Sequence, residues 1–155
     1  MNSRLRLRSL RGGLVLGISL AVPLSLSAGQ ATKKFDIPPG STTVSVTVES
    51  DNVRVNQVVL DIEKASGTGP LKKSGAEAEV RMDNNGSKDA EAGVAVVLLD
   101  AAGNIVAAGS CGTKVGWLKA GERDKCTAEF SYVYRNVKSA KSLMLTLETR
   151  EKPAK

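Results

Sequence analysis

Short runs in which apolar and polar residues alternate constrain this chain more than any other feature. Residues 43–49 place Val44, Val46 and Val48 on one side and polar residues on the other, and residues 76–83 repeat the pattern. A period of two residues is typical of a β-strand with one buried face. The chain shows no helical periodicity of convincing length beside these runs, so we expect an all-β fold.

Turn residues separate the expected strands and help to fix their number. Val55 and Val58 differ in parity, which predicts a β-bulge or a short break at Asn56–Gln57. Asp100 can bond the backbone at a turn entry, and Gly103 can adopt the left-handed conformation that closes a type I turn with a bulge. Further strands are expected at residues 53–62, 93–99, 105–111, 125–134 and 142–149, with a loop at residues 66–75. Seven or eight short strands predict an antiparallel β-sandwich.

Residues 93–99 differ from the other strands because they are apolar at both parities. This pattern favours a central strand that is covered on both sides. Periodicity alone also allows a buried helix, but the β-branched content of the run favours a strand.

Residues 1–31 predict a cleavable secretion signal. Four arginines precede an uncharged apolar run at residues 14–26, and small residues follow it. The run holds 13 residues, whereas a membrane-spanning helix needs about 20. We therefore expect cleavage after Ala28 or Ala31 and no stable membrane insertion afterwards. The mature protein is expected to be extracytoplasmic, either periplasmic or secreted.

Loss of this segment changes the charge argument. The full chain carries 22 basic and 16 acidic residues, a net charge of +6, and four of the basic residues leave with the signal. The mature chain then has a net charge of about +2, with its basic and acidic residues interleaved. Lys33–Lys34 and Lys72–Lys73 are interpreted as solvated charges, so nucleic acid is not expected as a partner.

About 125 residues remain, which is enough for one domain with a proper core. Pro38, Pro39 and Gly40 argue against a helix at the start of this domain. We expect a tether or first edge strand at residues 32–42, the β-sandwich at 43–150 and a disordered tail at 151–155.

The two cysteines, Cys111 and Cys126, predict a disulfide in an oxidising compartment. Such a bridge would close a loop of about 15 residues and stabilise the fold by about 3 kcal/mol in the chain-entropy model. Trp117 and Leu118 lie in that loop, and a tryptophan on a loop held at both ends is a candidate partner-binding residue. The alternative is that Trp117 folds over the open end of the sandwich.

The run Val96–Asp100 and the segment 118–122 before Phe130 resemble the FxLYD-type immunoglobulin-like domains of exported bacterial proteins. The family motif is Phe-any-Leu-Tyr-Asp. Leu98 and Asp100 match it, while Val96 and Leu99 replace the two aromatic residues. The resemblance covers residues 76–149. It implies an immunoglobulin-like sandwich without catalytic residues that serves binding or assembly.

Composition argues against an enzyme. The chain has no histidine, which removes the usual general base and the common zinc sites. Glu77 and Glu79 share a strand face, but we interpret them as a solvated polar face rather than a catalytic pair. Residues 83–89 hold several oxygen donors and lack the distal glutamate of a calcium loop, which favours a plain turn. We expect no cofactor and no metal.

The alternating aromatic residues Phe130, Tyr132 and Tyr134 could bind sugars or single-stranded nucleic acid, but are expected to be core residues.

Taken together, these features predict an exported non-enzymatic interaction module that binds another envelope or extracellular protein. The alternative is a structural subunit of a cell-envelope or surface assembly, and strand addition at an exposed edge would serve either role. A small-ligand carrier would need an apolar cavity.

Overall fold

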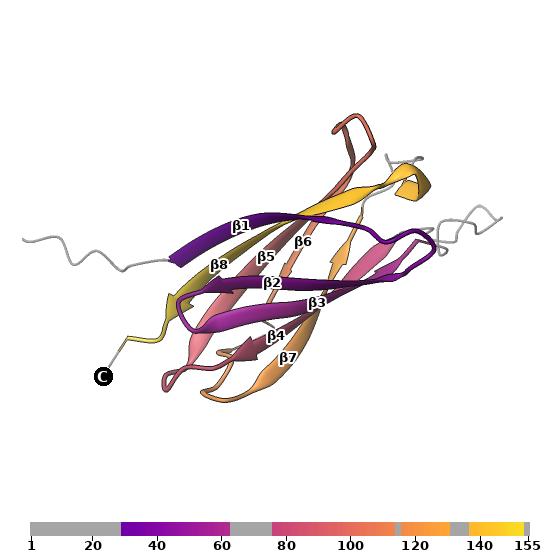
Figure 1. Cartoon of the computed structure of the whole chain (residues 1–155). Helices are drawn as coiled ribbons and strands as arrows, with labels where there is room; N and C mark the ends of the chain where they lie inside the picture. Colours follow the sequence, from indigo (N-terminus) through magenta and orange to yellow (C-terminus); the bar gives the residue numbers. More distant parts are fainter. Residues whose placement is uncertain (1–28, 63–75, 114–115, 131–136, 154–155) are drawn as a thin grey trace, which may run out of the picture.

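The computed structural model describes residues 29–62, 76–113, 116–130 and 137–153, and these form a two-layer β-sandwich (Figure 1). Its strands are β1 (Gly29–Asp36), β2 (Thr43–Ser50), β3 (Val53–Asp61), β4 (Glu77–Asn84), β5 (Ala90–Leu99), β6 (Ile105–Gly112), β7 (Arg123–Glu129) and β8 (Ser142–Glu151), with a short 3-10 helix, η2 (Val137–Ser139). Sheet A has the strand order β1-β8-β5-β6 and sheet B the order β2-β3-β4-β7. All neighbouring strands within each sheet are antiparallel. The predicted antiparallel β-sandwich is confirmed.

The core between the two sheets is aliphatic. In β2, β3, β4 and β7, buried residues alternate with more exposed ones, as the period of two predicts. The largest fully buried side chains are Leu60, Met82, Leu98, Leu118, Leu143, Leu145 and Leu147. Phe130 also lies in the core, as expected, whereas Tyr132 and Tyr134 lie outside the described residues.

Two predicted irregularities are present. The register between β3 and β4 shifts between Val55 and Gln57, so the change of parity marks a bulge inside one continuous strand. Gly103 has a φ of 84°, and its N–H donates to the Asp100 carbonyl at 3.1 Å. The Asp100 carboxylate accepts from the backbone N–H groups of Ala102 and Asn104. Local turn chemistry thus fixes the hairpin between β5 and β6, which projects beyond the sheets in Figure 1.

The prediction that β5 is covered on both sides is wrong. Val94, Val96 and Leu98 are buried against sheet B, but Gly93 is exposed and the outward side chain of Val97 is only partly buried. β5 lies between β8 and β6 and is therefore central within its sheet. In a two-layer sandwich a central strand packs one face against the other sheet, and on the other side of β5 only Leu99, at its end, is buried.

The folded chain extends beyond both expected boundaries. β1 begins at Gly29, so residues 29–31 pair with β8 although the sequence assigns them to the secretion signal. At the other end, β8 includes Glu151, and the Lys152 N–H donates to the Asp89 carbonyl at 2.8 Å.

The expected loop at residues 66–75 lies outside the described residues. Within the described ranges, no helix is both long and apolar enough to cross a membrane.

The predicted disulfide is present and joins the two sheets at one corner. Cys111 of β6 and Cys126 of β7 have an S–S distance of 2.04 Å and a Cα–Cα distance of 5.6 Å. Beside it, a β-carbon at Gly109 would lie 2.7 Å from the Glu129 carbonyl oxygen. Glycine therefore allows β6 to approach β7 closely at the corner that the disulfide closes.

Replacement of both Cys111 and Cys126 by alanine is expected to lower the free energy of unfolding by about 3 kcal/mol, because the unfolded chain regains loop entropy. Urea denaturation of the parent and the double variant measures this difference. A reductant should shift the midpoint of the parent and leave that of the double variant unchanged. Equal midpoints for the oxidised parent and the variant would contradict the expectation.

Candidate functional site

Leu118 is a core residue. It is 1% exposed, and its backbone pairs with Ala90 of β5 through hydrogen bonds of 2.8 and 2.9 Å. The loop before β7 thus runs along the start of β5 and inserts one leucine between the sheets. Leu118 cannot contact a partner from this position. The expectation that Leu118 binds a partner is therefore wrong, and of the two candidate residues only Trp117 remains.

Trp117 is partly exposed and lies among charged side chains at the end of sheet A. The Arg150 guanidinium carbon lies 5.6 Å from the ring centroid and the Lys152 ammonium 5.9 Å from it. Arg150 also pairs with Glu91, and Lys152 pairs with Asp89 at 3.1 Å. The indole is therefore partly covered by two cationic side chains, while some of its surface stays accessible. Trp117 is not among the partly buried residues that pack against the hydrophobic core, and its role as a partner-binding residue stays a prediction.

An apolar strip crosses the outer face of sheet A. Val97 of β5 lies opposite Met144 of β8 on one side and Ala108 of β6 on the other. All three are partly buried, and they point away from the core because they alternate with buried residues. Ile105 adjoins them at the start of β6 and is 59% exposed. We call Val97, Ile105, Ala108 and Met144 the apolar strip.

A hollow of about 430 Å³ separates the apolar strip from Trp117. It is lined by Glu91, Gly93, Glu148, Thr149 and Arg150. Gly93 pairs with Gly112 of β6 on one side and with Glu148 of β8 on the other. Because neither glycine has a side chain, the surface is recessed at this point. The apolar strip, the hollow and Trp117 therefore follow one another along the outer face of sheet A.

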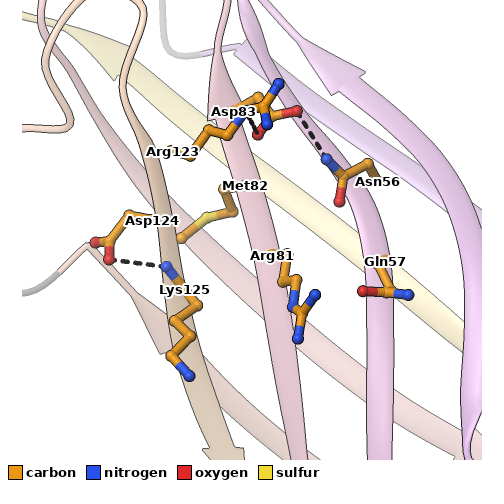
Figure 2. A pocket seen from close by; sticks show the side chains of 8 residues that line it. All are labelled: Asn56, Gln57, Arg81, Met82, Asp83, Arg123, Asp124 and Lys125. Carbon is orange, nitrogen blue, oxygen red and sulfur yellow. Dashed lines mark hydrogen bonds and ion pairs between the residues drawn. The ribbon is translucent and has the colours of Figure 1, made fainter.

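The outer face of sheet B is polar, and several of its charged side chains form ion pairs with one another. A hollow of about 410 Å³ lies over β3, β4 and β7 (Figure 2). Asp83 accepts a hydrogen bond from Asn56 at 2.7 Å and pairs with Arg123 at 3.4 Å. Nearby, Glu79 pairs with Lys125 at 2.8 Å and with Arg81 at 3.1 Å. The carboxylates of Asp83 and Glu79 therefore have their hydrogen-bond and ion-pair partners within the sheet.

The ion pairs of Glu79 also set its acid-base behaviour. Hydrogen bonds from Lys125 and then from Arg81 hold the pKa of Glu79 below its usual value. A carboxylate with a lowered pKa and two cationic partners is a poor proton acceptor at neutral pH. The interpretation of Glu77 and Glu79 as a polar face rather than a catalytic pair agrees with this arrangement of Glu79.

The turn after β4 is held by Asn84. This buried side chain donates to the carbonyls of Lys88 and Leu118, at 2.9 and 3.0 Å, and accepts from the N–H of Gly86. The carboxylate of Asp89 is held by Lys152. Residues 85–89 therefore form a turn between β4 and β5 that the Asn84 side chain holds. In the part of the chain that the structure describes, no three potential metal ligands cluster.

No family model matches the chain, and a search of curated proteins also finds no match. The resemblance to FxLYD-type domains therefore stays a prediction.

The apolar strip was missed by the sequence reasoning. Its members belong to three strands that are brought together only by the pairing of β5 with β6 and β8. Residues 93–99 do carry a sign of this surface, because apolar residues occupy both the odd and the even positions of the run. That pattern predicts burial on two sides as readily as an apolar outer surface.

Substitution of the two loop residues should separate their roles. Leu118→Ala is expected to lower the free energy of unfolding by about 2 to 5 kcal/mol, as for other buried leucines. Trp117→Ala should cause a smaller loss, because the side chain is partly exposed and its contacts with Arg150 and Lys152 are surface contacts. Urea denaturation of both variants checks the order, and a larger loss for Trp117→Ala would show that the indole is mainly a structural residue.

The Glu79→Gln variant should reveal a pH-dependent contribution of the ion pairs on sheet B. Since the folded-state pKa of Glu79 is lowered, its stabilising effect is present above the unfolded-state pKa and is lost as the pH falls through the folded value. The variant should therefore be less stable than the parent at pH 7 and nearly equal to it at pH 2. Urea midpoints at both pH values test this, and a difference that persists in acid would contradict it.

Proposed function

We propose that this protein is an exported, non-enzymatic interaction module that binds another envelope or extracellular protein through the outer face of sheet A. The observation that carries the proposal is the contrast between the two outer faces. The outer face of sheet B is covered with paired charges, while that of sheet A presents the apolar strip. Apolar surface that is flanked by polar residues is typical of protein interfaces.

The composition of this face fits the binding of a protein. Tryptophan and arginine are enriched among the residues that contribute most to binding energy, and Trp117 and Arg150 lie in contact at one end of the face. Ile105, at the other end, follows the hairpin that Asp100 holds in place. A site on a rigid sheet loses little conformational entropy on binding.

The disulfide supports export, because such bridges persist in oxidising compartments. The sequence of residues 1–31 supports the same location.

The proposal is tested by crosslinking the tagged protein in cells at its native level and identifying the captured protein by mass spectrometry. Ile105→Asp is expected to reduce capture of the main partner about tenfold or more, since loss of 1.4 kcal/mol of binding energy changes affinity tenfold. Trp117→Ala should also reduce it. Ser45→Asp adds the same charge at an exposed position of sheet B and should leave capture unchanged.

Two results would count against the proposal. Equal loss of capture with Ile105→Asp and Ser45→Asp would show that the outer face of sheet A is not the binding surface. Recovery of self-crosslinks alone would favour the structural subunit of an envelope or surface assembly instead.

A further inference from the structure

A polar cluster joins the two sheets where β1 begins. Thr149 of β8, 2% exposed, donates its hydroxyl to the Asp51 carboxylate at 2.7 Å and lies 2.9 Å from the Ser50 hydroxyl. Because Thr149 has one hydroxyl proton, Ser50 donates to Thr149. The carboxylate of Asp51 thus accepts a hydrogen bond at the end of a short chain of buried hydroxyls.

Gly29 lies directly against this carboxylate. A β-carbon at Gly29 would lie 2.4 Å from Asp51 Oδ2 and 2.5 Å from Ser50 Oγ, so the space of a side chain is already occupied. The backbone nitrogen of Gly29 is two bonds from that β-carbon position, which places it within about 5 Å of the carboxylate oxygen. Among the described residues, Asp51 has no lysine or arginine as an ion-pair partner.

The turn that carries Asp51 is built around an uncommon backbone conformation. Asp51 has a φ of 49°, in the left-handed region that few residues other than glycine adopt. The conformation lets β2 turn into β3 while the Asp51 carboxylate reaches Thr149 and Gly29 on sheet A. The carboxylate thus stands beside the first residue of β1, without a countercharge from the described side chains.

We propose that the mature chain begins at Gly29 and that Asp51 binds its terminal ammonium group. The inference uses the export premise of the proposed function but concerns a different part of the molecule. A signal endopeptidase hydrolyses the Ala28–Gly29 bond with water: the hydroxyl adds to the Ala28 carbonyl carbon, and the nitrogen of Gly29 leaves as an amine that takes up a proton. The new positive charge then supplies the partner that Asp51 lacks.

The alternative cut after Ala31 would remove part of the fold. Gly29, Gln30 and Ala31 pair with Thr149, Glu148 and Leu147, and Ala31 packs against the core. A chain that begins at Thr32 would lose these three pairs and would leave Asp51 beside an empty position. The peptidase acts on the extended chain, and of the two expected cuts the one after Ala28 keeps all the pairs that β1 makes with β8.

The cut is tested by expressing the full chain with its own leader and measuring the intact mass of the exported product. A mass that corresponds to residues 29–155 is expected. A product that begins at Thr32 would overturn the inference and leave export intact. An unprocessed chain would overturn both the inference and the export premise.

The role of Asp51 is tested in purified protein, which does not depend on export. Asp51→Asn is introduced into a chain that begins at Gly29 and into one that retains residues 25–28, where residue 29 carries no ammonium. Asparagine tolerates the left-handed backbone and can still accept from Thr149. The substitution should lower the urea midpoint more in the chain that begins at Gly29, and equal shifts would overturn the role of Asp51.

Discussion

Burial of one face of every strand between the two sheets is the interaction on which the rest of this structure depends. The buried side chains are mainly valine, leucine and alanine, and few aromatic residues contribute. Burial of one valine or leucine side chain stabilises a fold by about 1.5 to 3 kcal/mol, so a continuous aliphatic layer can hold the sheets together. Since each strand uses one face for this layer, the chemistry of its other face is free to differ between sheets A and B.

The strands with strict alternation were predictable because burial of one face leaves a direct trace in the sequence. Residues 43–49 and 76–83 became β2 and β4, and the change of parity at Asn56–Gln57 became a bulge in β3. β5 was predictable as a strand, but the partial exposure of Gly93, Ala95 and Val97 on its outer side was not. A strand with apolar residues on both sides has two hydrophobic faces, but its sequence does not show whether a second layer covers the outer one.

The candidate site was harder to predict because it depends on contacts between distant parts of the chain. Trp117 was identified from its place in a loop between two cysteines, which is local information. The burial of Leu118 depends on its pairing with Ala90, and the apolar strip depends on the register between Val97 and Met144. No local sequence pattern encodes such pairings. The sequence could therefore point to Trp117 as a candidate residue, but it could not show which other residues lie near it on the surface.

The edges of the sandwich support the proposal that a partner binds a face of the sandwich rather than adding a strand to one of its edges. The disulfide and the close approach at Gly109 hold β6 against β7 at one corner. At the other, the Lys33 ammonium of β1 reaches the Thr47 carbonyl of β2 at 3.1 Å. Lysines on an edge strand oppose pairing with another chain. The protected corners and the ion pairs on sheet B therefore support the proposal that a partner binds the outer face of sheet A.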